Sequence, residues 1–361
     1  MGSSAGKREI RVLVTGGTED RFGPALSVAL ELRNRSGKIA PAWVGAVENR
    51  ERKMCKRYHI PYLPTKIPPI RHNLTAAFSY LRETVRLTVL FGRKRPGAIV
   101  SFGGPESFPV LTAASFRSVP YFLHEQNTVP CFVNRFFARG AKKVFLGFSV
   151  AERSLNGSVE VTGTPIRTEV RNYNDTDYPS NLCREKTTIL VANADAYNGA
   201  GDFIDTMVPL VKGWSAEGLQ VVWETGHEHY NEVKQALDGC RGAILFPQIG
   251  DLYPYYALSH VVIGRSTASF LAELAYFGLP CICIPAKKDG GEWVNAGVVE
   301  NQGWGIRVAP ENWNSEIDKA VKEIISNEKS FERMSQFALD NAPSEAAARI
   351  TGIIVDELKV D

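Results

Sequence analysis

The four residues His124-Glu125-Gln126-Asn127 are the best candidates for chemistry in this chain, because each carries a hydrogen-bonding side chain and they stand in a row. They close a short apolar run, Tyr121–His124, of the kind that predicts a buried strand. Such a row makes a poor core and a good ligand site, and in open α/β sheets ligands bind outside the carboxyl ends of the strands. The row therefore predicts a site at a sheet edge, while His124 taken alone could be a structural histidine.

Two glycine turns are expected on the same edge. The predicted strand Ile10–Thr15 runs into Gly16-Gly17-Thr18, and a helix should begin near Pro24. A second strand, Ala98–Phe102, runs into Gly103-Gly104. A glycine turn between a strand and a helix exposes backbone N–H groups where an anion is favoured, so both turns are candidate anion sites. At the first turn an ordinary tight turn is the alternative.

The residues after the first turn act in opposite directions. Glu19 and Asp20 place negative charge where a phosphate would sit, whereas Arg21 would attract one. Three polar elements that converge on one edge exceed what chance supplies, so we favour a binding site there.

The second half of the chain has one similar candidate binding site at the end of a predicted strand. Gly264-Arg265-Ser266 closes a predicted strand, and the helix that follows carries Glu273 among apolar neighbours. A carboxylate there either binds a pair of ligand hydroxyls or is only solvated on the helix surface, and the residues alone leave the choice open.

The segment Leu74–Arg95 is predicted to be a helix with an apolar stripe bordered by cations. The stripe consists of Leu74, Phe78, Leu81, Val85 and Val89, and the cations are Arg82, Arg86, Arg93, Lys94 and Arg95. Such a helix suits an anionic membrane surface, and the alternative is a helix packed on its own sheet.

Short apolar runs alternate with helical segments along the whole chain, which predicts parallel sheets covered on both faces. The polar stretch Arg171–Lys186 separates two such halves, and the last segment, Ala342–Lys359, is again helical. The other predicted strands are Ala42–Gly45, Lys143–Leu146, Val159–Thr162, Thr188–Val191, Leu219–Thr225, Ala243–Phe246, His260–Gly264 and Cys281–Pro285.

Length and composition bound the function. A chain of 361 residues fits two domains, and its net charge of +3 is too small to argue for a nucleic-acid partner. The six cysteines show no CxxC pair and the six histidines no ligand spacing, so we expect reduced thiols and no metal or other cofactor. No apolar run is long enough to span a membrane, and the N-terminus lacks a secretory signal, which favours a cytoplasmic protein.

The whole chain resembles the MurG family of glycosyltransferases, which add N-acetylglucosamine to lipid I in peptidoglycan synthesis. The resemblance is closest over Ser101–Gly147, and it continues at Gly163-Thr164-Pro165-Ile166-Arg167 and from Arg265 through Glu273 to Asn295-Ala296. It implies two Rossmann-like, doubly wound domains that face each other across a cleft, the GT-B arrangement. We expect an acceptor and membrane-side domain at 1–165, joined by the helix 342–361, and a UDP-sugar domain at 166–341.

The resemblance also implies roles for single residues. Glu273 would hold the ribose hydroxyls, the backbone of Ile249 would contact uracil, and Asn127 and Asn295 would lie near the sugar. Arg167, together with the helix that starts near Ser266, would stabilise the departing UDP. Gly16, Gly17, Thr18, Gly103 and Gly104 would bind the diphosphate of the acceptor.

The catalytic candidates are Glu125 and Arg21. Glu125 is the carboxylate of the matched block that we expect near the cleft, so it is the candidate base. Arg21 stands where the family has a candidate catalytic histidine, and an arginine can bind phosphate but cannot act as a base near neutral pH.

Three loops depart from the family's pattern. They are Glu19–Arg21, Ala192–Ala196 and Gly291-Glu292, the last in place of a Gln-Gln pair. The first expectation is inverting, metal-independent transfer from UDP-GlcNAc to lipid I by a peripheral protein on the inner face of the cell membrane. The alternatives are another sugar donor or polyprenyl acceptor, and a non-catalytic scaffold.

Overall fold

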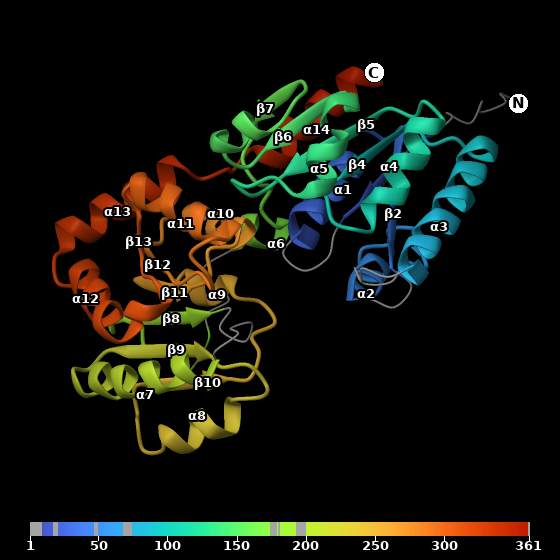
Figure 1. Cartoon of the computed structure of the whole chain (residues 1–361). Coiled ribbons are helices and arrows are strands. Elements are labelled where there is room, and N and C mark those ends of the chain that lie inside the picture. Colours follow the sequence, from blue (N-terminus) through green and yellow to red (C-terminus); the bar gives the residue numbers. More distant parts are fainter. Residues whose placement is uncertain are drawn as a thin grey trace, which may run out of the picture. The chain divides into compact units, whose positions relative to one another are not determined.

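The computed structural model describes residues 9–16, 21–46, 50–67, 74–173, 179, 181–192 and 200–359. The chain divides into two compact units, which are drawn together in Figure 1. Unit 1 consists of Met1–Thr168 and Pro343–Asp361, and unit 2 of Glu169–Ala342. Each unit is built around its own parallel sheet.

Unit 1 has a seven-stranded sheet with the order β3-β2-β1-β4-β5-β6-β7. All its strand pairs are parallel. The strand order reverses between β1 and β4, and this is the kind of place where ligands bind in doubly wound sheets. The strands are β1 (Ile10–Thr15), β2 (Ile39–Ala46), β3 (Tyr62–Thr65), β4 (Ala98–Ser101), β5 (Tyr121–Glu125), β6 (Lys143–Leu146) and β7 (Val159–Val161).

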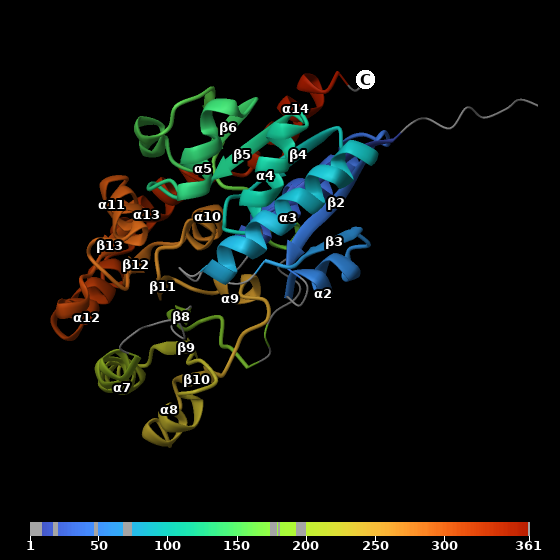
Figure 2. The same cartoon turned by 45° about the vertical axis from the view of Figure 1, so that its right-hand side comes forward.

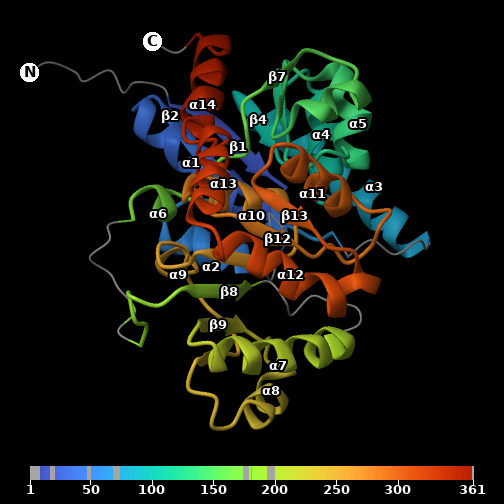
Figure 3. The ribbon, with the colours of Figure 1, turned by 90° about the vertical axis from the view of Figure 1, so that its left-hand side faces the viewer.

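Helices cover both faces of this sheet, because successive residues of its strands are apolar on both sides. Val12 and Val14 of β1 pack in one core cluster with α1 and α14, and Leu13 packs in another with α3 and α4. Figure 3 shows α14 lying along α1, and Figure 2 shows α3 beside α4. The helices are α1 (Phe22–Arg35), α2 (Arg50–Arg57), α3 (Leu74–Arg93), α4 (Ser107–Phe116), α5 (Phe132–Phe137) and α14 (Ala346–Glu357), with the 3-10 helices η2 (Ala138–Gly140) and η3 (Ser149–Ser154).

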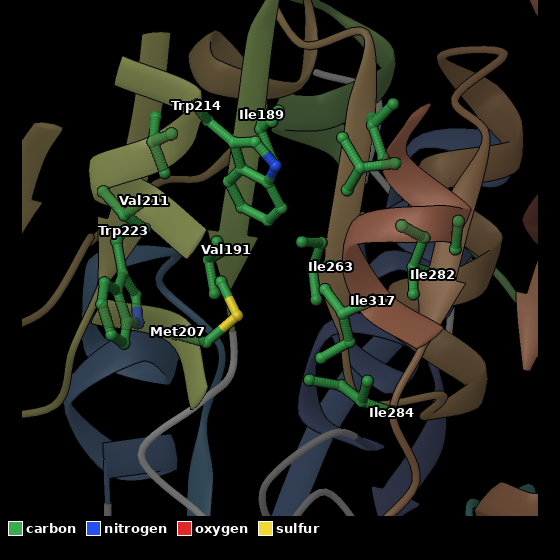
Figure 4. Close-up of a cluster of buried hydrophobic side chains, with 14 of the residues drawn as sticks. Ile189, Val191, Met207, Val211, Trp214, Trp223, Ile263, Ile282, Ile284 and Ile317 are labelled. Atoms are coloured by element: carbon green, nitrogen blue, oxygen red, sulfur yellow. The ribbon is translucent and has the colours of Figure 1, made fainter. Parts of the chain in front are cut away.

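Unit 2 has a six-stranded parallel sheet with the order β10-β9-β8-β11-β12-β13, and its order reverses between β8 and β11. Trp214, Trp223 and Met207 pack against the isoleucines and valines of this sheet (Figure 4). The strands are β8 (Thr188–Ala192), β9 (Gln220–Glu224), β10 (Ala243–Phe246), β11 (Val261–Gly264), β12 (Cys281–Cys283) and β13 (Gly305–Arg307). The helices are α6 (Thr168–Arg171, at the start of the unit), α7 (Ala200–Ala216), α8 (Tyr230–Ala236), α9 (Tyr253–Tyr256), α10 (Ala268–Tyr276), α11 (Gly291–Asn301), α12 (Trp313–Ile325) and α13 (Glu328–Asp340), with the 3-10 helix η4 (Pro310–Asn312).

Every strand predicted from the sequence is present, and the two-domain α/β fold is confirmed. Two strands, β3 and β13, were not predicted, and each lies at one edge of its sheet. Pro64 in β3 and Gly305 in β13 weaken the strand pattern, and an edge position tolerates both.

Candidate functional site

The two glycine turns of unit 1 lie against each other at the ends of β1 and β4. Gly16 has a φ of +86°, and a Cβ added there would lie 2.0 Å from the carbonyl oxygen of Gly103. Gly103 and Gly104 also have positive φ, and the Ser107 hydroxyl donates to the Gly103 carbonyl at 2.7 Å. Only glycine fits this close approach, so the turns predicted to bind an anion form one edge. Gly17 and Thr18 lie outside the described residues.

The carboxylate of Glu125 is buried and accepts three hydrogen bonds from its own loop. Oε1 accepts from the Asn127 N–H at 3.1 Å, and Oε2 accepts from the Cys131 N–H and the Asn134 Nδ2, both at 2.9 Å. Burial raises the pKa of Glu125, while these donors and the nearby charge of Arg21 lower it. A general base must reach the proton that it removes. This geometry argues against the predicted base and indicates a side chain that braces the β5–α5 loop.

His124 is fully buried and uncharged. Its Nε2 lies 3.1 Å from the Gly163 carbonyl oxygen, so this nitrogen carries the proton and donates. The ring stacks on Phe102 with centroids 5.1 Å apart, and burial lowers the pKa of His124 to about 4. Nδ1 is therefore left as a hydrogen-bond acceptor, and no protein atom described in the structure bonds to it.

Buried polar atoms without a protein partner gather at this edge of unit 1. Besides His124 Nδ1 they include the Thr15 hydroxyl, both amide atoms of Gln126 and Oδ1 of Asn134, counting partners among the described residues. Thr15 ends β1, and Gln126 and Asn134 flank the loop after β5. Buried polar groups are normally satisfied by protein, water or ligand, so this concentration indicates a binding site. Gln126 belongs to the polar row singled out in the sequence, although no role of its own was predicted for it.

Two arginines lie near the start of α1. Arg21 is the residue before Phe22, and its charge acts on Glu125 and Cys131. Arg167 lies close to Gly23, where an added Cβ would meet the Arg167 Cγ at 2.9 Å. Cationic side chains at a helix N-terminus strengthen its attraction for an anion, so the two predicted phosphate-binding arginines belong to one neighbourhood of unit 1.

In unit 2, Ser266 and Asn295 are brought together after β11. The Ser266 hydroxyl donates to the Glu292 carbonyl oxygen at 2.7 Å, and Asn295 Nδ2 donates to the Ser266 carbonyl oxygen at 3.0 Å. Both residues are fully buried. Arg265 forms an ion pair with the Glu292 carboxylate, with Nε donating to Oε2 at 3.0 Å. The loop before α10 is thus fixed to the start of α11.

Glu273 and Ile249 lie on different elements of unit 2. Glu273 is 7% exposed within α10, so the alternative of a solvated surface carboxylate is wrong. Ile249 lines a cavity of about 560 Å³ with Phe246, Gln248, Asp251 and Tyr255. The Ile249 N–H already donates to Oε1 of Glu224 at 2.8 Å. A base in this cavity would therefore find the Ile249 N–H occupied. Glu224 was not among the residues predicted for the site, although it ends a strand as Glu125 does.

The apolar stripe of α3 faces outward. Phe78, Leu81, Val85 and Val89 are 45–67% exposed, whereas Leu87 and Phe91 are buried in the core. The helix does pack on its own sheet, but through Leu87 and Phe91, and these four side chains of the stripe are left exposed. Phe116, Phe132 and Phe136 are also exposed, and Phe108 of α4 contacts the last two rings. We call these seven exposed side chains the apolar face of unit 1.

No group of His, Cys, Asp or Glu side chains in the described part of the chain could hold a metal ion. Of the helices in that part, none is long and apolar enough to cross a membrane.

Comparisons with known proteins match both halves of the chain to one family. The model of the glycosyltransferase family 28 N-terminal domain matches residues 11–146, and that of the family 28 C-terminal domain matches residues 198–350. The UDP-N-acetylglucosamine–N-acetylmuramyl-(pentapeptide) pyrophosphoryl-undecaprenol N-acetylglucosamine transferase of Bacillus subtilis is 24% identical, over 97% of this chain and 100% of its own. The transferase of the same name from Shewanella pealeana is 28% identical over 96% of this chain and 97% of its own.

Solved structures confirm the fold. MurG of Acinetobacter baumannii superposes with a TM-score of 0.74 at 20% identity, covering 96% of this chain and 99% of its own. The UDP-GlcNAc 2-epimerase of Neisseria meningitidis, with UDP-GlcNAc bound, superposes with a TM-score of 0.69 at 14% identity, over 96% of this chain and 100% of its own. Similarity at this level of identity shows a shared two-domain architecture.

Proposed function

The chain belongs to glycosyltransferase family 28, and we propose that it transfers N-acetylglucosamine from UDP-N-acetylglucosamine to lipid I, the undecaprenyl-diphosphate-linked muramyl pentapeptide, to give lipid II. The observation that carries this proposal is the extent of the match. Relatives of that activity align with this chain over nearly its whole length, through both domains in order.

In this proposal unit 2 binds the donor. The cavity beside Ile249 has aromatic walls from Phe246 and Tyr255, whose rings pack edge to face, and its volume suits a nucleobase. Glu273 is a buried carboxylate on α10 and would accept hydrogen bonds from the ribose hydroxyls. Ser266 and Asn295, tied to each other, would shape the sugar end.

Unit 1 then binds the acceptor diphosphate at its glycine turns. The support is the positive φ of Gly16, Gly103 and Gly104, with Arg21 at the start of α1. Arg167, which we expected at the departing UDP, lies beside Gly23 of the same helix. In an inverting transfer, the acceptor hydroxyl oxygen bonds to the anomeric carbon, the bond to the UDP oxygen breaks and the hydroxyl proton passes to water. The residues proposed here bind and orient the substrates and stabilise the negative charge of UDP.

The apolar face of unit 1 supports contact with an anionic membrane surface. Aromatic and aliphatic side chains project there, and the exposed cations Arg82 and Arg93 lie on α3, with Lys94 just after it. Apolar insertion and attraction to anionic lipid headgroups together suffice for peripheral binding. We propose that the protein works on the cytoplasmic face of the membrane, where a lipid-linked acceptor would be presented.

A transfer of another sugar is the second candidate, and one observation favours it. Glu292 replaces a glutamine of the family's pattern, and its carboxylate is held by Arg265. An acidic group in place of an amide changes the donors and acceptors offered to a sugar hydroxyl.

The deciding experiment gives the full chain lipid I in detergent and a panel of labelled UDP-sugars. We expect UDP-GlcNAc to be the preferred donor and lipid II to be the product. Preference for another UDP-sugar would establish the second candidate, and no transfer from any of them would refute the enzyme activity.

A matched pair of variants tests the donor site. Glu273→Gln should raise the KM for UDP-GlcNAc about 10- to 100-fold, since hydrogen bonds to a charged group contribute about 1.5–3 kcal/mol. Glu323→Gln changes an exposed carboxylate of α12 and should leave the KM unchanged. Equal effects of the two substitutions would remove Glu273 from the donor site.

A further inference from the structure

Two buried carboxyl groups flank the carboxyl end of β1. Glu51 lies at the start of α2, just after β2, and Glu106 lies in the turn after β4. The strands β2 and β4 are the two neighbours of β1 in the sheet. Glu51 is 3% exposed and Glu106 is 6% exposed, and the charge of Glu106 acts on Glu51. The two acids therefore bracket the Thr15–Gly16 turn.

The hydrogen bonds around Glu51 fit a neutral carboxyl group. The Tyr62 hydroxyl donates to the Ala46 carbonyl oxygen at 2.7 Å and lies 3.4 Å from Oε2 of Glu51. A hydroxyl has one proton and the shorter bond to Ala46 takes the larger share of it, so Oε2 receives only a weak hydrogen bond from Tyr62. Oε1 of Glu51 is buried without a partner, and no cation in the described part of the chain pairs with this carboxyl. A buried, unpaired carboxylate is costly, so the protonated form is favoured.

The other groups around this carboxyl also disfavour a negative charge. Burial and the charge of Glu106 raise the pKa of Glu51 to about 7, against smaller opposing effects of the Trp43 indole and the Tyr62 hydroxyl. Cys55 of α2 has its pKa raised to about 12 by burial and by Glu51. Burial, followed by the charge of Glu51, raises the pKa of Tyr62 too, with Arg52 opposing the rise.

Burial raises the pKa of Tyr80 in α3, and the charge of Glu106 raises it further. Gly45 is packed so closely that an added Cβ would meet Tyr62 and Glu51 at 2.5 and 2.6 Å. The carboxyl of Glu51 is thus confined beside the end of β1.

We propose that Glu51 must carry its proton for an anionic ligand to bind at the Gly16 and Gly103–Gly104 turns, so that Glu51 is a positioning residue which links this binding to pH. The proposal rests on the proposed function, which puts the acceptor diphosphate at this edge. With Glu51 ionised, a diphosphate would meet two negative charges at the end of β1, and with Glu51 neutral it meets one.

The test uses a short-chain prenyl diphosphate sugar as probe, because a diphosphate diester keeps the same charge across the neutral pH range. Its Kd for the full chain should be constant below about pH 6. Above pH 7, near the pKa of Glu51, the Kd should rise toward about tenfold per pH unit, the limit for one linked proton. Glu51→Gln, which imitates the neutral form, should bind equally well at pH 6 and pH 8. Glu152→Gln, an exposed carboxylate of η3, should keep the dependence of the unchanged protein.

A second variant guards against misfolding of the first. Glu106→Gln removes the neighbouring negative charge, so the pH at which binding weakens should move down. A flat pH profile in the unchanged protein, or weak binding by Glu51→Gln at every pH, would overturn the proposal. If the probe binds at no pH, the acceptor site of the proposed function has failed. Whether Glu51 carries a proton in the folded protein is then tested without ligand, by the pH dependence of the free energy of unfolding described below.

Discussion

Replacing Glu125 by glutamine distinguishes a structural brace from a catalytic base. The carboxylate accepts three hydrogen bonds, from Asn127, Cys131 and Asn134. A glutamine has one acceptor oxygen, which can face the Cys131 and Asn134 donors and keep two of the bonds. Its NH2 group then faces the Asn127 N–H, a donor against a donor. One lost bond with a buried unsatisfied donor costs about 1–3 kcal/mol.

The free energy of unfolding and kcat, measured together, distinguish the two roles of Glu125. We expect Glu125→Gln to lower the free energy of unfolding of unit 1 by about 1–3 kcal/mol in urea, followed by the fluorescence of the buried Trp43. Glu125→Ala leaves all three donors unpaired and should cost more, about 3–5 kcal/mol. For a brace, kcat measured on the folded fraction should fall less than about tenfold. For a base, loss of proton transfer would lower kcat about 100- to 10,000-fold.

The control is Glu152→Gln, which makes the same chemical change at an exposed site and should alter neither quantity. The brace would be refuted if Glu125→Gln left stability within about 0.5 kcal/mol of the unchanged protein and lowered kcat at least 100-fold.

Three further changes test other parts of the chain. Phe78→Ser, at a side chain 67% exposed, should weaken binding to anionic vesicles about five- to tenfold in a sedimentation assay, while Phe337→Ser in unit 2 should not. Gly16→Ala should destabilise unit 1 by more than about 2 kcal/mol in thermal unfolding, because its Cβ would strike the Gly103 carbonyl oxygen. The control Gly37→Ala has open space around it and should be nearly neutral. Equal effects of the two substitutions would contradict the close approach of the two turns. Glu51 has a folded-state pKa of about 7, above its ordinary 4.5, so its contribution to stability is complete below pH 4.5 and is lost as pH rises through 7. The loss should be about 3 kcal/mol and absent in Glu51→Gln, and identical pH profiles of the two proteins would show that Glu51 carries no such proton.

The sequence predicts the sheets well because parallel, buried strands are short apolar runs. It also locates the polar edge, since side chains at a strand end can be read from position alone. The role of Glu125 could not be predicted, because it depends on how the start of α5 turns Cys131 and Asn134 back toward the strand. For Glu51 the decisive neighbour is Glu106, which is far away in sequence and comes close only through the fold.

The helix α3 illustrates a different limit. Its sequence has two apolar stripes, one containing Phe78 and Leu81 and the other Leu87 and Phe91. Helical spacing shows that both exist but not which one meets the sheet. The second stripe is buried beside α4, and the first is left exposed with the cations.

The return of the chain to unit 1 sets an order of folding during synthesis. Ile350 and Ile354 of α14 complete the core that α1 and β1 begin, whereas unit 2 is one continuous stretch, Glu169–Ala342. All residues of unit 2 are therefore made before α14. Unit 1, although most of it is made first, needs α14 to complete its core. A stop codon just before Pro343 would leave unit 2 intact and expose the apolar side of α1.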